Sequence, residues 1–418
     1  METNKSLNLQ IVNNLVLIVG VDIGKRRHFA RFRFPDGHIS KPFSFENTKE
    51  GFTQMEQQIR LNLEKGKYKS VVVGVESTGH YWKPFVYYFD ELPDIRLVQV
   101  NPAHVKKAKE IYDSSPGKTD QKDPAVIAML IQMGKFQELN LPRGEFASLR
   151  VYARQREQKI TELGIQRNIL HSLVDSIFPE YGSVFQKLES KTSLYVLERY
   201  PTPELIIKLG ARRLAVALNK ASRGQLSVDR AQELSNAASS SIGMREGVDA
   251  VIFAIRTTVK NIKRVQKEIT EIEKLMAVSL SKIPYAKQLV SIHGIGPVTL
   301  SIILGEIGDI TRYRRAEEII KLAGLNLYEI SSGQHRGRRR ISKRGRPLLR
   351  KTLFFAALRM VKTKGVFRED YSRMTESNKM QKTKALVALS RKLLRVLFAL
   401  ARDNVPYESP KAKIALAA

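Results

Sequence analysis

The first 136 residues carry hydrophobic patterns typical of both strands and helices. Continuous apolar runs predict strands that are buried on both faces, and alternating runs predict strands with one solvated face. The expected strands cover residues 15–22, 28–34, 39–45, 70–76 and 95–100. Apolar side chains at helical spacing predict helices over residues 50–63, 81–92 and 119–133. Three successive strands followed by alternating helices and strands indicate a mixed sheet with helices on its faces, an α/β fold.

The pattern changes after residue 145, where apolar residues recur every seven positions in two long segments. The first seam runs through Leu163, Leu170 and Ile177, and the second through Ile255, Ile262, Ile269 and Met276. Such heptads predict coiled-coil helices. The two helices could form an antiparallel pair within the chain or an arm for oligomerisation, because a heptad pattern alone does not determine which helix is the partner. Between the seams, residues 178–244 are partly helical and match no known motif.

The chain is too long for one hydrophobic core, because single cores stop growing at roughly 250–300 residues. Pro284 ends the second heptad segment, and a helical, strongly basic region follows. We therefore expect four parts. They are an α/β domain (1–145), a coiled-coil arm with a helical insertion (146–285), a helical domain (286–402) and a tail (403–418).

Composition narrows the class of protein. The 418 residues include 71 Lys and Arg against 41 Asp and Glu, a formal charge of +30, which indicates a polyanionic partner such as nucleic acid. The absence of cysteine excludes disulfides, a cysteine nucleophile and thiolate zinc sites. No histidine pair has zinc-ligand spacing. No apolar run approaches the ~18 residues of a membrane span, and the first is too short for a signal peptide. A cytoplasmic protein without a membrane partner is expected.

Four carboxylates form the first candidate site. Asp22 and Glu76 end the two most apolar strands, where a buried acid is costly without a partner. Asp120 and Asp123 lie three apart at the start of a predicted helix and so share one face. Such a set can hold one or two Mg²⁺ (or Mn²⁺) ions for phosphodiester chemistry. The alternative is structural: Thr119 and the two aspartates would simply cap that helix.

Two further stretches are suited to contacting phosphates. Gly294 and Gly296, in a Gly-Ile-Gly-Pro turn between apolar helical segments, suggest a helix-hairpin-helix, although an ordinary helix corner has a similar pattern. Residues 333–351 then hold nine basic side chains and no acid, which favours nucleic-acid binding over a loose basic loop. These nine are Arg336, Arg338, Arg339, Arg340, Lys343, Arg344, Arg346, Arg350 and Lys351.

A serine pair directly precedes the basic stretch. In Ser331-Ser332-Gly333 a hydroxyl lies among arginines, which would stabilise the charge that develops when a hydroxyl attacks phosphorus. From composition alone, a Ser-Gly pair is more simply a turn.

Taken together, the motifs identify a family resemblance. The chain resembles the transposases of the insertion-sequence-110 type, relatives of the Piv-type DNA invertases, with the motifs in family order and the middle of the chain matching least. The matching segments are GVDIGK (20–25), VGVESTGHYW (73–82), NPAHVK (101–106), KTDQKD (118–123), residues 292–297, GLNLYEISSG (324–333) and ISKRGRPLLRKTL (341–353). Pro124 and Arg346 stand where the family pattern has a small residue and Asn.

This resemblance implies a ribonuclease-H-type, RuvC-like N-terminal domain, with the four acids as its D-E-D-D metal ligands. It implies a coiled-coil arm and a transposase domain in which Ser332, or Ser331 if the alignment shifts by one, is the nucleophile. Recombination would then pass through a covalent phosphoserine link, with metal site and serine from different protomers of a dimer or tetramer. A structured bridge RNA would direct the choice of donor and target DNA.

The residues alone allow two other functions. One is a metal-dependent DNA junction endonuclease, which would share the acids but use water as its nucleophile. The other is a non-enzymatic binder of RNA or DNA, which would need only the positive charge.

Overall fold

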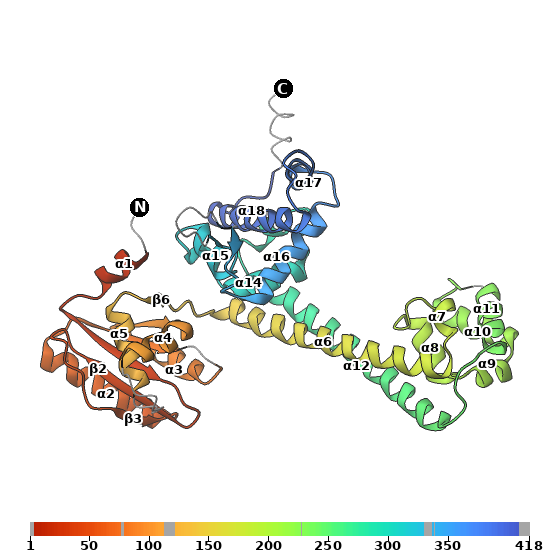
Figure 1. Ribbon diagram of the computed structural model, residues 1–418, viewed down its shortest axis with the longest axis horizontal. Helices are drawn as coiled ribbons and strands as arrows, with labels where there is room; N and C mark the ends of the chain where they lie inside the picture. The colour runs from red at the N-terminus through yellow and green to blue at the C-terminus, as the bar shows by residue number, and fades with distance from the viewer. Residues whose placement is uncertain are drawn as a thin grey trace. The chain divides into compact units, whose positions relative to one another are not determined.

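The computed structural model describes residues 4–76, 79–112, 122–226, 228–329, 337 and 339–408. The chain divides into two compact units, Met1–Leu141 and Pro142–Ala418. Figure 1 shows the first as an α/β unit and the second as helices with a small hairpin. The predicted mixed sheet followed by a mostly helical remainder is confirmed.

The first unit is built on a six-stranded mixed sheet of order β3-β2-β1-β4-β5-β6. The three central strands β1, β4 and β5 are parallel, whereas β2, β3 and β6 run antiparallel to their neighbours. The strands are β1 (Val16–Asp22), β2 (Arg27–Arg33), β3 (Phe43–Glu46), β4 (Ser70–Glu76), β5 (Ile95–Val100) and β6 (Phe136–Glu138).

Helices cover both faces of this sheet, which explains why its central strands are apolar throughout. One face packs against α2 and α3 through a core rich in aromatic residues, and the other packs against α4 and α5. The helices of this unit are α1 (Asn4–Ile11), α2 (Lys49–Gly66), α3 (Trp82–Phe89), α4 (Pro102–Tyr112) and α5 (Asp123–Gln132).

Two helices of 34 residues, α6 (Gly144–Ile177) and α12 (Val248–Ser281), run side by side in opposite directions (Figure 1). The start of α6 shares a core with the end of α12, and the end of α6 shares another with the start of α12. All four residues of the predicted second seam are buried. Arg156 interrupts the first seam, but its Nε donates to Glu273 of α12 at 2.7 Å. Residues of both heptad seams thus pack against each other within the chain.

Residues 178–244 fold as a helical cap at the far end of this pair. The cap encloses one continuous core with the ends of α6 and α12, in which Phe178, Tyr181 and Leu214 are fully buried. Its helices are α7 (Tyr181–Val184), α8 (Lys191–Arg199), α9 (Pro203–Leu209), α10 (Ala211–Ser222) and α11 (Val228–Ser239).

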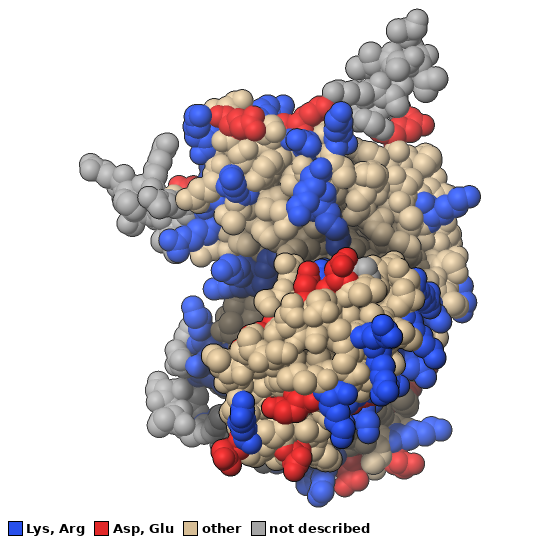
Figure 2. Space-filling model, turned by 90° about the vertical axis from the view of Figure 1, so that its right-hand side faces the viewer, with Lys and Arg blue, Asp and Glu red and all other residues tan. Residues whose placement is uncertain are grey.

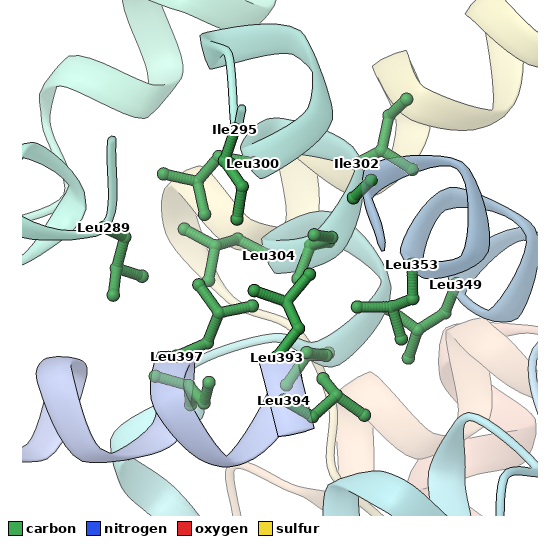
Figure 3. Packing of buried hydrophobic residues seen from close by; sticks show 14 of the residues in the cluster. Leu289, Ile295, Leu300, Ile302, Leu304, Leu349, Leu353, Leu393, Leu394 and Leu397 are labelled. Carbon is green, nitrogen blue, oxygen red and sulfur yellow. The ribbon is translucent and has the colours of Figure 1, made fainter. Parts of the chain in front are cut away.

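The remaining helices surround a leucine- and isoleucine-rich core at the other end of the pair. In Figure 3, Leu304 of α14, Leu353 of α16 and Leu393 of α18 point toward one another. The elements are α13 (Ala286–Val290), α14 (Pro297–Ile307), η1 (Ile310–Arg312), α15 (Ala316–Leu322), β7 (Leu327–Tyr328), β8 (Arg340–Ile341), α16 (Pro347–Met360), α17 (Val366–Ser372), η2 (Arg373–Ser377) and α18 (Lys382–Asp403). Within the described ranges, no helix combines the length and apolar character needed to cross a membrane.

Candidate active site

Two of the predicted acids lie at the same edge of the sheet. Asp22 ends β1 and Glu76 ends β4; these strands are parallel neighbours, and Val21 lies opposite Val75 in their register. Val21 and Val75 belong to the core on the α2–α3 face. Because successive side chains of a strand point to opposite faces, Asp22 and Glu76 belong to the α4–α5 face.

Helix α5 brings a third acid to this edge. The helix can lie close to the sheet because the residues beneath it are glycines, which have no side chains. Gly20 of β1 lies opposite Gly74 of β4 in the register. A Cβ added to Gly20 would lie 1.9 Å from the carbonyl oxygen of Pro124, in the first turn of α5. The helix backbone therefore rests directly on β1, and Asp123, the first residue of α5, starts beside the strand ends that carry the other two acids.

The charges at this edge influence one another. Burial raises the pKa of the Glu76 carboxyl; the nearby Lys109 ammonium lowers this pKa and the negative charge of Asp123 raises it. Lys109, on α4, also binds Asp123 directly, with its Nζ 2.5 Å from Oδ2. This lysine compensates negative charge between two predicted metal ligands. The sequence motifs did not single it out, since nothing in its spacing distinguishes it from the other lysines of α4.

The donor set fits a hard divalent cation in kind, because carboxylate oxygens are the ligands preferred by Mg²⁺ and Mn²⁺. Asp22, Glu76 and Asp123 share one end of the sheet, whereas Asp120 lies outside the described residues. Among the residues described here, no three His, Asp or Glu side chains lie close enough to hold an ion as they stand. The four-ligand metal site stays a prediction.

The predicted nucleophile belongs, by sequence, to the connection of a short hairpin. Strands β7 and β8 pair antiparallel, with Leu327 opposite Ile341 and Tyr328 opposite Arg340. Ser331 and Ser332 fall between these strands and outside the described residues. The structure therefore describes the frame of the hairpin and leaves the choice of serine as a prediction.

Hydrogen bonds fix the base of this hairpin to the helical core. The Ser342 backbone N–H donates to the Asn326 carbonyl at 2.9 Å, and that of Lys343 donates to Gly324 at 3.0 Å. Arg350 of α16 donates through Nη1 to the Ala323 carbonyl at 3.1 Å. The two ends of the hairpin are thus held together before its strands begin.

Arg346 is held inside the protein. Its side chain is only 21% exposed, and its Nε lies 3.9 Å from Oε2 of Glu306, a carboxylate that is 3% exposed within α14. Burial lowers the pKa of Arg346, the charge of Glu306 raises it, and a weaker effect of Arg154 lowers it again. Arg154 of α6 approaches the other oxygen, Oε1, at 3.3 Å. Glu306 was not predicted from the sequence, although a lone acid within an apolar helix was a signal that could have found it.

The other predicted phosphate contacts differ in their surroundings. Arg339 pairs with Glu329 at 3.0 Å, and Lys351 pairs with Glu157 of α6. Arg336 and Arg338 lie outside the described residues. Those that are solvent-exposed without such a pairing in the described structure are Arg340, Lys343 and Arg344. Figure 2 shows that Lys and Arg are spread over the visible face, with Asp and Glu among them.

The predicted helix-hairpin-helix turn lies between α13 and α14. Gly294 has a φ of +91°, a backbone conformation that favours glycine, and the turn leads to Gly296 at the N-terminal cap of α14. A Cβ added to Gly296 would meet no atom within 4 Å, so the backbone at this position is open. Phosphate binding by the turn stays a prediction.

Comparison with known families connects both halves of the chain to one group of proteins. A DEDD transposase model of the IS110 type matches residues 19–179, and a model described as transposase IS116/IS110/IS902 family matches residues 286–372. The predicted carboxylates fall within the first match, and the predicted serine falls within the second.

Similar proteins come from insertion elements of Streptomyces and Mycobacterium species. A 43.6 kDa protein of element IS110 from Streptomyces coelicolor is 25% identical over 94% of this chain and 96% of its own length. A 42 kDa protein of IS900 from Mycobacterium paratuberculosis is 25% identical over 75% of this chain and 78% of its own. A 44.8 kDa protein of IS116 from Streptomyces clavuligerus is 25% identical over 69% and 72%.

Proposed function

We propose that this chain, which belongs to the transposases of the insertion-sequence-110 type, breaks and rejoins DNA with a serine nucleophile and Mg²⁺ under the direction of a structured RNA. Its membership of this family makes it a transposase enzyme that acts on DNA. The nucleophile, the metal and the RNA are the proposed steps beyond that. A RuvC-like, ribonuclease-H-type assignment of the first unit is supported by its mixed sheet.

The observation that carries the proposal is the position of three carboxylates at one end of a buried sheet. Asp22, Glu76 and Asp123 start from neighbouring strand and helix ends. Together with Asp120 they would hold the metal, which when bound would stabilise negative charge on a phosphodiester and its leaving oxygen. Lys109 would move away from Asp123 or share it, because its ammonium now binds the oxygen Oδ2.

The proposed chemistry balances without any consumed cofactor. The Ser332 oxygen attacks phosphorus, a bond from phosphorus to one DNA oxygen breaks, and the hydroxyl proton goes to solvent or to the departing oxygen. A hydroxyl of the second DNA end then attacks the phosphoserine and restores the serine. Exposed basic residues beside the hairpin, such as Lys343 and Arg344, would hold the negatively charged strands.

The family resemblance adds two features to this proposal, and both concern partners other than a single chain. Metal site and serine would come from different protomers of a homo-oligomer, and a structured bridge RNA encoded by the element would select donor and target. The net charge of +30 supports a polyanionic partner of this kind.

The decisive test compares Ser332→Ala with the matched variant Ser331→Ala in a strand-transfer assay with Mg²⁺. We expect Ser332→Ala to lose strand transfer and the protein–DNA adduct that survives denaturation, while Ser331→Ala retains both. Cleavage by Ser332→Ala without an adduct would indicate the water-using endonuclease instead. Unchanged function in the double variant Asp22→Asn with Glu76→Gln would indicate a non-enzymatic binder.

A further inference from the structure

The β7–β8 hairpin presents one large ring to solvent. Tyr328 is 41% exposed, although it lies in a regular strand pair at the edge of a well-packed core. In the described parts of the chain, its ring stacks on no other aromatic side chain and lies under no cation. A ring held in this way offers a free face for a flat ligand.

The register of the hairpin shows which groups share that outward face. Ile341 packs against the hydrophobic core, so the pair Leu327–Ile341 marks the side of the hairpin that faces the core, although Leu327 itself is 45% exposed. The pair Tyr328–Arg340 therefore belongs to the outer face, where directly opposite residues have Cβ atoms about 5 Å apart. A phenol ring and a guanidinium, both exposed, lie next to each other there.

We propose that Tyr328 and Arg340 form a stacking site for an unpaired DNA base next to the phosphate that the serine attacks. The inference rests on the proposed function, because Tyr328 precedes Ser332 by four residues in the same hairpin. Exchange of strands between two DNA molecules requires bases next to the cut to leave their partners. An exposed tyrosine ring can stack on such a base whatever its identity. The guanidinium of the neighbouring arginine binds the phosphate or stacks on the next base.

The backbone at the base of the hairpin is already held in place, which lowers the entropy cost of binding a base. Its base is closed by the Ser342–Asn326 and Lys343–Gly324 backbone hydrogen bonds. Gly345 also packs closely on residue 322, which holds the base of the hairpin in place. A Cβ added to Gly345 would lie 2.4 Å from the Leu322 carbonyl oxygen. A platform whose backbone is already ordered loses little conformational entropy when a base binds. Lys343 and Arg344, exposed at the foot of β8, supply the positive potential that brings in a strand.

The experiment uses the full chain without divalent ions, so that binding is measured in the absence of reaction. The sequence contains one tryptophan, Trp82. The variant Trp82→Phe with Tyr328→Trp therefore carries its only indole at the proposed site. We expect single-stranded oligothymidylate to quench its fluorescence, and a duplex of equal length to leave it unquenched.

Affinity provides the second readout. We expect Tyr328→Ala to weaken oligothymidylate binding roughly 5- to 100-fold, as loss of one base–aromatic stack does, and Tyr328→Phe to bind within about twofold of the native chain. The matched control is Phe253→Ala, which removes a 73% exposed ring from α12 and is expected to leave binding unchanged.

Two outcomes would overturn the inference. They are equal affinity of Tyr328→Ala and the native chain, or equal quenching by duplex. Neither affects the Ser332→Ala adduct test, so failure of this site is distinguishable from failure of the proposed function.

Discussion

The two candidate reactive regions, the carboxylate edge of the sheet and the β7–β8 hairpin, are built in opposite ways. The carboxylates are positioned by regular structure: two parallel strands in register, and a helix that lies directly on one of them. The hairpin strands have two residues each, and their support comes from a few hydrogen bonds and a buried charge cluster in the helical core. The acids lie on a rigid frame, whereas the two strands of the hairpin depend on a small number of anchors.

The difference also appears in how each region manages charge. At the sheet edge, burial raises the pKa of Glu76, and Lys109 partly offsets the cost of keeping that group ionised. Below the hairpin, a nearly buried carboxylate, Glu306, faces two arginines. We therefore expect the hairpin to be most sensitive to changes of charge, and the carboxylate edge to be most sensitive to changes of shape.

The largest expected effect comes from Glu306→Gln. The amide keeps the shape but removes the charge, so the largely buried guanidinium of Arg346 is left without its counter-ion. Breaking a buried pair in this way costs about 3 kcal/mol or more. Urea denaturation should show this loss, and hydrogen exchange should locate it in α14, α16 and the strands β7 and β8.

Glu317→Gln is the matched control, because Glu317 pairs with Arg395 at 3.3 Å while both side chains remain exposed. We expect a change of about 0.5 kcal/mol or less there. The double variant Glu306→Leu with Arg346→Met should regain most of the stability, since no buried charge is left unpaired. If both glutamine variants lose the same stability, Glu306 is not the anchor of the hairpin.

Shape is tested at the carboxylate edge by Gly20→Ala. The new methyl group would lie 1.9 Å from the Pro124 carbonyl oxygen, so α5 must move away from β1 and take Asp123 with it. We expect a loss of about 1–3 kcal/mol in the N-terminal unit, as for other overpacked cores. Strand transfer should fall roughly 100-fold, because a shift of about 1 Å in a catalytic group has effects of that size.

Thermal unfolding and the Mg²⁺-dependent strand-transfer assay measure the two effects of Gly20→Ala. Gly164→Ala in α6 is the control, since no atom lies within 4 Å of the added carbon there. Alanine in an open helical position stabilises by about 0.5–1 kcal/mol, so activity should be kept. Native activity in Gly20→Ala would show that the position of α5 on β1 does not set the metal site.

The sequence predicts best where burial is two-sided or periodic. Strands β1 and β4 are apolar throughout because helices cover both faces, and the seam of α12 repeats strictly every seven residues. Helix α4 was not predicted, since only Val105 and Ala108 among its described side chains are buried. Strand β6 has three residues, too few for a period, and β3 begins at Phe43, because Ile39 forms only an isolated bridge to Arg33.

Site prediction has the same limits. Asp22 and Glu76 could be predicted because each follows an apolar run, and acids in such places need a physical reason. Lys109 and Tyr328 could not, since their importance comes from residues far away in sequence or from the opposite strand, whereas the lone acid Glu306 in the apolar segment 297–307 could have been found. The pairing of Lys109 with Asp123 depends on how α4 and α5 pack together, which local patterns do not encode.

The smallest expected effect lies on the face of the sheet opposite the carboxylates. His28 of β2 is fully buried among Phe45, Phe52 and Phe85, and this burial lowers its pKa, with the Asn47 side chain opposing the shift. The folded state therefore keeps the imidazole neutral to a lower pH than the unfolded chain, which takes up a proton below about pH 6.5. Stability present above that pH is lost as the pH falls, by at most about 1.4 kcal/mol per pH unit.

His28→Leu should remove this pH dependence. Between pH 7.5 and 5.5 the native N-terminal unit is expected to lose about 1 kcal/mol more than the variant, measured as urea midpoints at each pH. His38→Gln, which changes an exposed histidine of the same unit, should keep the native slope. Parallel pH profiles for native and His28→Leu would mean that the ring accepts its proton in the folded state. The aromatic face of the sheet would then tolerate a charged group as the carboxylate edge does. Burial alone would not explain a difference between the two faces in how they accommodate charge.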